Sequence, residues 1–479
     1  MTQRGSSSAN DRRKKSGKSS LATHPFGKGR QKNGAAIMSA ELASAGPAPQ
    51  RVQPHVVHIE KPIYGGAFLA RVEGKAMFVP LTLPGEQARV RIAQDKRGYA
   101  TAEVEEIVAP APERVAPACA HFGACGGCDY QHAQYAAQLG YKQAILRETL
   151  ERGGVHAPEQ MTVLAGEPWS YRNRIRLALD AAGRPGYRGR RSHAVTPIAA
   201  CPIAAPVLVR AALAAAEILH QAAPRLRATE MALFCNAEES ELLLSVFTAS
   251  GEKTGFAAFA EALHQRVPAL AGAELVAEGR AGQPPRTLTQ WGASSLTYRA
   301  GGFDYRVDHG AFFQVNRWLL DSLVGALAER VTAGPAGNLA WDLFAGVGLF
   351  ARRLAQSFAR VVAVESAPMA MAALAHNLSG TTGRAVKAET LAFLRKNRHG
   401  ERPDLIVADP PRTGLGVEVC ALLGEMAAPA LTLVSCDPAT LARDLRALLG
   451  AGYAMESIVL ADLFPQTFHL ETVVHLRRA

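Results

Sequence analysis

Cysteine is scarce in this chain, and long apolar segments are absent. The 479 residues include seven cysteines, an odd number, which argues against a disulfide-based scaffold. No apolar run reaches the roughly 18 residues that a membrane helix needs. The opening residues, Met1–Arg4, lack the apolar core of a signal peptide. We therefore expect a cytoplasmic protein without membrane contact, although the Arg- and Ser-rich, acid-poor start would also suit a transit peptide.

Acidic side chains are also in deficit. Asp and Glu together number 42, against 53 Lys and Arg, which gives a formal net charge of +11. This excess favours a polyanionic partner such as nucleic acid, because basic side chains neutralise phosphates. Hydrophobic residues make up 48% and charged residues 20%, as is typical of soluble globular proteins. The length indicates two to four domains.

The N-terminal part of the chain divides into two segments. Residues 1–50 are rich in Ser, Gly, Ala, Lys and Arg and predict a disordered basic arm, which either adds grip on RNA or is a solvated tail. Between 51 and 112, short β-rich runs alternate with turns such as Gly65-Gly66 and Pro84-Gly85. This pattern predicts an OB-like barrel of five strands. Such barrels often bind oligonucleotides, but a purely structural barrel would show the same pattern.

The remainder of the chain predicts two further domains. A mixed central domain is expected over 113–300, with a helix at 134–152, strands at 174–179 and 242–247, and packing helices at 205–225 and 256–272. From 301 to 479, apolar runs alternate with helical segments. The predicted strands are 339–344, 361–365, 404–408 and 431–435. This alternation predicts an α/β domain with a Rossmann-like parallel sheet and helices on both faces.

Four cysteines form a candidate metal site. Cys119, Cys125 and Cys128 lie on a glycine-containing loop before the predicted helix, and Cys201, followed by proline, can supply a fourth thiolate. Four thiolates suit an iron–sulfur cluster or a zinc ion, and the spacing leaves both open.

A glycine turn marks a candidate cofactor site. The predicted strand at 339–344 runs into Gly346 and Gly348, where the backbone can approach a ligand closely. Glu365 ends the next strand, where an acid can accept hydrogen bonds from ribose hydroxyls. A dinucleotide dehydrogenase is the alternative, but the third glycine of its motif is missing. Asp409, in an Asp-Pro-Pro sequence, ends a further strand at the same sheet edge.

The motifs, taken together, resemble a known family. Residues 64–66 and 79–86 are similar to the TRAM domain, an RNA-binding barrel. The cysteine loop at 119–142, Gly-Ala-Phe-Phe-Gln-Val-Asn at 310–316, Ser-Cys-Asp-Pro at 435–438 and the segment 464–471 resemble the RNA uridine-5-methyltransferases. These are class I methyltransferases that use S-adenosylmethionine.

The resemblance implies a mechanism. Carbon 5 of uracil is a weak nucleophile, so a thiolate adds to carbon 6 and raises the electron density at carbon 5. After methyl transfer, a base removes the proton from carbon 5 so that the thiolate can leave. The resemblance makes Cys436 the nucleophile and Glu471 the base. The cofactor contacts that it implies are Gln314, Phe344, Glu365, Asp409 and, on the adenine side, Glu389. The ligands of a [4Fe–4S] cluster that it implies are Cys119, Cys125, Cys128 and Cys201.

The resemblance also implies an RNA partner and a monomeric enzyme. A barrel combined with a cluster is most similar to bacterial enzymes that methylate 23S ribosomal RNA, with transfer RNA as the alternative substrate. We expect the basic segment 170–176 to contact RNA beside a flipped-out base, unless it is simply a solvated sheet face.

Three other classes fit less well. A non-catalytic RNA-binding iron–sulfur protein has no need of Cys436 and Glu471. A radical enzyme usually has three residues between its first two cluster cysteines, whereas five separate Cys119 from Cys125. A DNA cytosine-5-methyltransferase places its cysteine where this chain has Asp409-Pro410-Pro411.

Overall fold

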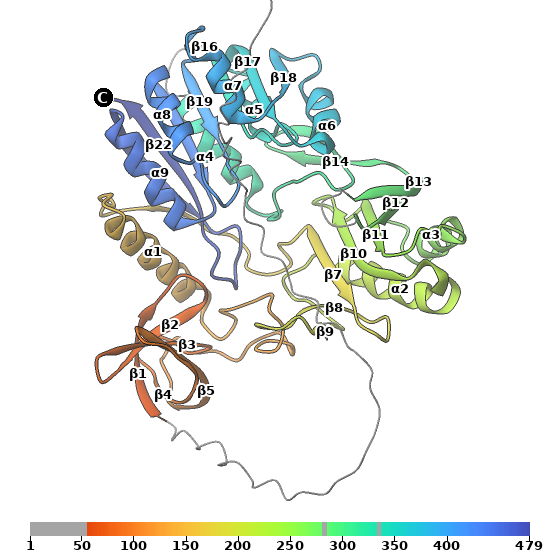
Figure 1. Ribbon diagram of the computed structural model, residues 1–479. Helices are drawn as coiled ribbons and strands as arrows, with labels where there is room; N and C mark the ends of the chain where they lie inside the picture. The colour runs from red at the N-terminus through yellow and green to blue at the C-terminus, as the bar shows by residue number, and fades with distance from the viewer. Residues whose placement is uncertain (1–54, 280–284, 333–336) are drawn as a thin grey trace, which may run out of the picture. The chain divides into compact units, whose positions relative to one another are not determined.

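The computed structural model describes residues 55–279, 285–332 and 337–479; the predicted basic arm, 1–50, lies outside them. The described chain forms a closed barrel, a seven-stranded sheet, a two-stranded sheet and an eight-stranded sheet (Figure 1). In this part of the chain, no helix is both long and apolar enough to cross a membrane.

The barrel is formed by the first five strands, which close in the order β1-β2-β3-β5-β4. These strands are β1 (His55–Pro62), β2 (Ala67–Val72), β3 (Lys75–Pro80), β4 (Gln87–Asp95) and β5 (Tyr99–Ala109). Burial alternates along β1 and the start of β4 because successive side chains of a strand point to opposite faces. The β1–β2 turn requires Gly66, whose φ is +83° and whose Cβ would lie 2.8 Å from Oδ1 of Asp129. The predicted OB-like barrel is confirmed.

The seven-stranded sheet has the order β13-β12-β11-β10-β7-β8-β9. Its strands are β7 (Arg174–Leu179), β8 (Pro185–Arg188), β9 (Val195–Pro197), β10 (Ala228–Cys235), β11 (Leu242–Thr248), β12 (Leu270–Ala277) and β13 (Arg286–Gly292). Helices α2 (Pro206–Ala222) and α3 (Phe256–Arg266) pack on one face, and a 3-10 turn, η1 (Pro224–Leu226), follows α2. The helix predicted to reach residue 272 ends at Arg266, because Leu270 pairs with Leu242 in the sheet.

The eight-stranded sheet has the order β18-β17-β16-β19-β20-β22-β21-β6. Its strands are β6 (Thr162–Leu164), β16 (Gly337–Leu343), β17 (Phe358–Glu365), β18 (Gly383–Lys387), β19 (Leu405–Ala408), β20 (Ala430–Ser435), β21 (Tyr453–Ala461) and β22 (Glu471–Arg478). A small hairpin of β14 (Ser295–Ala300) and β15 (Phe303–Asp308) lies between β13 and β16 in the chain. The strands predicted at 339–344, 361–365, 404–408 and 431–435 are all present.

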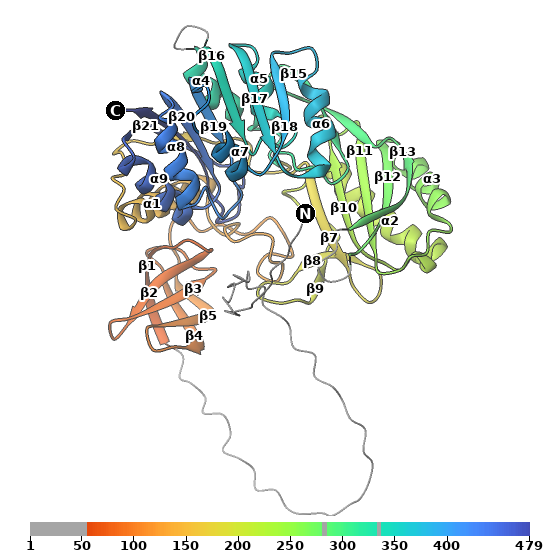
Figure 2. The same cartoon turned by 45° about the horizontal axis from the view of Figure 1, so that its top comes forward.

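Helices cover both faces of this sheet (Figure 2). The helices are α1 (Tyr135–Arg152), α4 (Leu320–Thr332), α5 (Leu349–Leu354), α6 (Pro368–Leu378), α7 (Thr390–Asn397), α8 (Val417–Met426) and α9 (Pro438–Gly450). Neighbouring strand residues alternate between two cores: Ala340 packs with α4, α5 and α6, whereas Leu339 and Trp341 pack with α1, α7, α8 and α9. The predicted Rossmann-like layering is therefore confirmed.

Two details of this sheet differ from expectation. The sheet is not wholly parallel, because β22 runs antiparallel to both β20 and β21. The segment 462–470 returns the chain directly beside β21, whereas a parallel neighbour would need a long crossover. In addition, α1 and β6 come from the segment assigned to the central domain, yet α1 contributes Ile145 and Leu146 to a core of this sheet, and β6 pairs with β21.

Candidate active site

The chain order reverses between β16 and β19, which is where ligands of open α/β sheets bind, at the carboxyl ends of the strands. The turn that leaves β16 there has left-handed backbone at Phe344, Gly346 and Gly348, with φ values of +63°, +55° and +90°. A Cβ on Gly348 would meet Leu374 at 2.8 Å, whereas nothing lies within 4 Å of a Cβ on Gly346. The turn therefore leaves open space beside Gly346 for a bound molecule.

Two acids fix this turn. Glu365, at the end of β17, accepts hydrogen bonds from the backbone amide of Gly346 at 2.8 Å and from those of Ser366 and Ala367. Asp342, fully buried in β16, accepts one from the Ala351 amide at 2.8 Å. Burial, helped by the charges of Asp409 and Glu365, raises the pKa of Asp342 well above its usual range. Asp342 was not predicted as a site residue, although an acidic residue inside an apolar strand would have indicated a buried polar contact.

Three of the predicted cofactor contacts line one hollow beside the turn. Gln314, Phe344 and Asp409 lie around it together with Gly346. The side-chain amide of Gln314 points its Nε2 toward Oδ2 of Asp409 at 3.4 Å, and its backbone carbonyl accepts a hydrogen bond from Asn173 at 2.9 Å. The hollow, of about 40 Å³, and the Glu365-bonded turn meet at Gly346, at the carboxyl ends of the strands.

Glu389 lies outside this hollow. It precedes α7, its side chain is exposed, and it makes no capping hydrogen bond to the helix. Its neighbour Ala388 donates a backbone hydrogen bond to the carbonyl of Glu365 at 3.0 Å, which places Glu389 near the end of β17. An adenine contact from Glu389 stays a prediction.

Cys436 and Glu471 face each other across two strands. Ser435 pairs with Thr472 in the antiparallel β20–β22 ladder, so the next residues on the two strands, Cys436 and Glu471, are brought together. The Thr472 hydroxyl donates to the Ser435 carbonyl at 3.1 Å, which holds this end of the ladder. The thiol and the carboxyl group therefore share the sheet edge with Asp409.

The electrostatics of this pair follow from burial and from neighbouring acids. Burial raises the pKa of the Cys436 thiol to about 12, and the negative charges of Glu471 and Asp409 add to this effect. Burial, together with Asp409, raises the pKa of Glu471 well above its usual range, whereas Arg412 lowers it. Burial also raises the pKa of Asp409 to about 7. Arg412 opposes the rise at Cys436 as well, so it is the nearby cation that favours negative charge here.

One residue of this site comes from the barrel. Tyr64, in the β1–β2 turn, packs against the core below the eight-stranded sheet, and its ring meets that of Phe468 edge-on at 5.3 Å. Burial raises the pKa of the Tyr64 phenol, and Asp437 and Cys436 contribute to the rise. Tyr64 was not predicted as a site residue, because no local pattern could show that it lies near Cys436.

The loop that leads to Glu471 is held by α1. Lys142 and Asp462 form an ion pair that is completely buried, and Lys142 also donates to the Phe464 carbonyl at 2.9 Å. Gln138 and Gln466 exchange two hydrogen bonds, of 2.9 and 3.0 Å. Buried contacts with a helix thus hold the irregular segment that precedes Glu471.

The four predicted cluster ligands gather around a second cavity. Cys119, Cys125, Cys128 and Cys201 all line a space of about 240 Å³, together with His469 from the loop before Glu471. Burial raises the pKa of the Cys128 thiol to about 12 and raises those of Cys125 and Cys201. Over residues 55–279, 285–332 and 337–479, no three His, Cys, Asp or Glu side chains are arranged to hold a metal ion.

The chain matches two family models. Residues 400–479 match the model described as tRNA (Uracil-5-)-methyltransferase, and residues 53–104 match the TRAM domain. The solved structure of the Pyrococcus abyssi tRNA (uracil-54, C5)-methyltransferase, in complex with S-adenosyl-L-homocysteine, shares this fold with a TM-score of 0.70 at 22% identity. The match covers 88% of this chain and 100% of that one. The chain therefore has the fold of a class I methyltransferase.

Sequence relatives define the family more narrowly. A Halomonas elongata protein named 23S rRNA (uracil(1939)-C(5))-methyltransferase RlmD is 33% identical over 429 residues, covering 86% of this chain and 87% of the relative. A Chromohalobacter salexigens protein of the same name is 34% identical over 435 residues, covering 88% of each. The chain belongs to the family of S-adenosylmethionine-dependent RNA (uracil-5-)-methyltransferases, which confirms the resemblance found in the sequence.

Proposed function

We propose that this enzyme methylates carbon 5 of one specific uridine in 23S ribosomal RNA, through a covalent bond from Cys436 to carbon 6 of the base. The observation that carries the proposal is the register of β20 and β22, which sets Cys436 opposite Glu471 beside the hollow of Gln314 and Asp409. We also propose that the enzyme is a monomer, in which this single chain supplies all of these residues.

The residues of the hollow and the glycine turn would hold S-adenosylmethionine, which supplies a methyl group on a positively charged sulfur. Glu365, already fixed by three backbone amides, has the place expected for a ribose contact. Gln314, Phe344 and Asp409 line the adjoining hollow, and Glu389 lies beyond the end of β18, on the adenine side. The open space at Gly346 lets the cofactor approach the backbone there.

Cys436 starts the reaction as a nucleophile. Cys436 reacts as the thiolate, after its proton has passed to solvent. The sulfur forms a bond to carbon 6 of uracil, and the electron pair of the 5,6 double bond moves toward the carbonyl at carbon 4. Bound S-adenosylmethionine would supply the methyl group, which carbon 5 takes up as the bond between that group and sulfur breaks. Arg412, which opposes the rise of the Cys436 pKa, stabilises the negative charge that develops during this step.

Glu471 completes the reaction as a base. After methyl transfer, carbon 5 carries both a methyl group and a hydrogen. The carboxylate removes this proton, the double bond forms again, and the bond between Cys436 and carbon 6 breaks. A carboxylate whose pKa is raised by burial is a stronger base than an exposed one, and Glu471 is only 4% exposed.

Ribosomal RNA is the proposed substrate because the two cited relatives, about a third identical over most of the chain, are named for 23S rRNA. The TRAM barrel and the net charge of +11 support an RNA partner in general. Transfer RNA is the second candidate, since the solved structure with the same fold is named for it.

We further propose that Cys119, Cys125, Cys128 and Cys201 hold a [4Fe–4S] cluster. All four sulfurs border one cavity. Four thiolates suit an iron–sulfur cluster or a zinc ion, and the resemblance of the cysteine loop to the cluster loop of the family favours the cluster. Arg190 and Arg172, which lower the pKa of Cys125 and Cys128 respectively, partly offset the charge of the thiolates.

The decisive experiment supplies labelled S-adenosylmethionine and unmodified bulk RNA to the purified enzyme. Label should appear as 5-methyluridine in ribosomal RNA, and the Cys436→Ala variant should produce none, whereas the control Cys420→Ala should remain active. Cys420 is buried on α8 and lies in neither pocket. Label in transfer RNA would change the substrate, and turnover by Cys436→Ala would refute the covalent mechanism.

A further inference from the structure

A large cavity lies on the face of the seven-stranded sheet opposite α2 and α3. Its volume is about 640 Å³, within the range of roughly 300–1,000 Å³ that ligand sites usually have. Strands β7, β10, β11, β12 and β13 line most of it, and Asp308–Gly310 and Met369 close one side. The cavity shares no residue with the hollow that Gln314, Phe344 and Asp409 line. The two are close in the chain, because residues 308–310 are followed a few positions later by Gln314.

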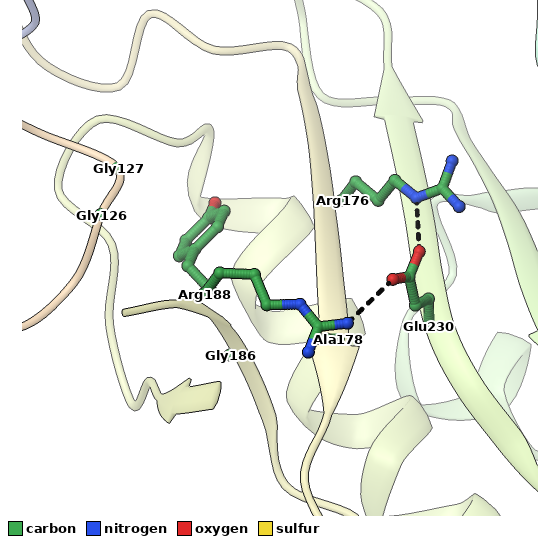
Figure 3. A pocket seen from close by; sticks show the side chains of 8 residues that line it. Gly126, Gly127, Arg176, Ala178, Gly186, Arg188 and Glu230 are labelled. Carbon is green, nitrogen blue, oxygen red and sulfur yellow. Dashed lines mark hydrogen bonds and ion pairs between the residues drawn. The ribbon is translucent and has the colours of Figure 1, made fainter. Parts of the chain in front are cut away.

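Two arginine–aromatic pairs form its walls. The guanidinium of Arg174 lies 4.6 Å from the ring centroid of Phe234, and that of Arg176 lies 4.3 Å from the ring centroid of Phe247. Nε of Arg176 donates a hydrogen bond to Oε2 of Glu230 at 2.7 Å (Figure 3). Planar cations stacked on aromatic rings are surfaces against which nucleobases stack.

Arg174 forms no ion pair with an acid among the residues that the structure describes. It lines the cavity and is half-buried, and its Nε atom is buried without a hydrogen-bond partner among those residues. Burial lowers the pKa of Arg174 to about 10, so the side chain stays charged at neutral pH. A half-buried cation without an acidic partner suits an anionic group from a ligand in the cavity, and in RNA that group is a phosphate.

The floor of the cavity offers a hydrogen-bond acceptor. Glu274, 5% exposed, accepts hydrogen bonds from the hydroxyls of Ser245 at 2.7 Å and Thr287 at 3.0 Å, one on each carboxylate oxygen. Ser245 in turn lies 3.3 Å from Nδ1 of His309. Nδ1 of His309 also lies 3.8 Å from Oε1 of Glu274. Each carboxylate oxygen can accept about two hydrogen bonds, so Glu274 can accept further hydrogen bonds from a ligand.

We propose that this cavity binds a guanine nucleotide of the substrate RNA, with the base edge on Glu274 and a phosphate on Arg174. Guanine is the standard base that presents two adjacent donors, the N1 hydrogen and the exocyclic amine, to a two-oxygen acceptor. Uracil and cytosine each present a single donor group on that edge, beside carbonyl or ring-nitrogen acceptors that the carboxylate would repel. The inference rests on the proposed RNA methylation and adds a second, extruded base as an element of substrate recognition.

The test measures RNA affinity, with S-adenosylhomocysteine present so that no turnover occurs. The probe is the RNA fragment that the wild-type enzyme methylates, prepared with single guanosines replaced by inosine, which lacks the exocyclic amine. Glu274→Gln should bind the natural fragment about tenfold more weakly or worse. One inosine position should weaken wild-type binding similarly and should cause no further loss in Glu274→Gln.

Two further variants separate recognition from folding. Met369→Trp should block the cavity from its side, because Met369 lines it and is 57% exposed, so no buried partner is lost. Val417→Trp, at a position 72% exposed on α8, and Glu261→Gln, exposed on α3, are the matched controls and should bind normally.

The outcomes also separate this inference from the proposed function. If the enzyme forms 5-methyluridine while Glu274→Gln and Met369→Trp bind RNA as the wild type does, the guanine site is wrong and the methylation stands. If inosine and Glu274→Gln each weaken RNA binding and the two effects multiply when combined, the direct contact between guanine and Glu274 is likewise rejected. If no RNA is methylated at all, both proposals fall.

Discussion

The backbone amide of Asp129 donates a hydrogen bond to the carbonyl of Gln466 at 2.8 Å. Asp129 directly follows Cys128, whereas Gln466 lies in the loop that leads to Glu471. The Tyr130 amide donates to the same carbonyl at 3.0 Å, and the Asp129 side chain accepts from the Phe468 amide at 3.4 Å. The cysteine loop thus supports the loop of the catalytic base, although more than 300 residues separate them in sequence.

This contact predicts that removing the cluster slows catalysis through Glu471. Cys125→Ser should lose the brown colour and its iron, and turnover should fall more than RNA affinity does. Iron content, turnover and RNA binding would be measured on the same preparation, with the buried non-ligand variant Cys235→Ser as control. Zinc in place of iron in the wild type would reject the cluster, and unchanged turnover after iron loss would reject the coupling.

Glu471→Gln should trap the covalent intermediate. Without a base to remove the proton on carbon 5, the bond to Cys436 cannot break, so protein and methylated RNA should migrate together on a denaturing gel. The double variant Cys436→Ala with Glu471→Gln should give no such species. Full turnover by Glu471→Gln would assign the base to another residue.

The buried ion pair of Lys142 and Asp462 predicts a large stability effect. Lys142→Met would leave Asp462 charged and unpaired at 0% exposure, which costs about 3–5 kcal/mol. Lys61→Met is the matched control, because the Lys61–Glu148 pair is 45% and 38% exposed and such pairs contribute about 1 kcal/mol or less. Denaturant titration of both variants would give the comparison, and equal losses would contradict the assigned burial.

Asp409 predicts a pH dependence of stability in the cofactor-free enzyme. Its pKa is about 7 in the folded protein, against about 4 in an unfolded chain, so between these pH values the folded state holds the proton more tightly. The stabilisation of the folded state by this bound proton is present below pH 4 and is lost as the pH rises through 7. Asp409→Asn should therefore be more thermally stable than the wild type at pH 8 but not at pH 4. A difference in melting temperature that does not change with pH would contradict the raised pKa of Asp409.

The matched control for Asp409 is an exposed acid. Asp304→Asn removes an exposed carboxyl group whose pKa the Arg299 hydrogen bond lowers, so it should show no such gain at high pH. Methylation by Asp409→Asn should be weaker because the pocket loses an acid, and this would show in the KM for S-adenosylmethionine.

Asp342 predicts a contrast between two substitutions. Burial raises the pKa of this carboxyl group, so a neutral amide suits the same place, and Asp342→Asn should preserve the hydrogen bond from the Ala351 amide and nearly all stability. Asp342→Ala should leave that buried amide unsatisfied, at a cost of about 1–3 kcal/mol, and should weaken cofactor binding. Thermal unfolding and cofactor titration would test this, and equal behaviour of the two variants would contradict a structural role for the hydrogen bond from Ala351.

Short segments of the sequence were enough to predict the individual strands and helices and to indicate the methylation of uracil. The glycine turn after β16 and the acid Glu365 were visible because their signals lie within short segments, and the barrel followed from alternating runs between turns. The family motifs around Cys436 and Glu471 were equally local. What a short segment specifies through backbone preference or side-chain period can be predicted without knowledge of distant contacts.

Contacts between residues that are distant in the sequence are known only from the folded structure. No periodic pattern in the sequence could show that β22 runs antiparallel to β20, that Tyr64 of the barrel lies near Cys436, or that Lys142 pairs with Asp462. The cavity above Glu274 likewise arises where several strands meet residues 308–310 and Met369. These arrangements depend on long-range packing, in which the burial of apolar faces fixes the partners of each polar group.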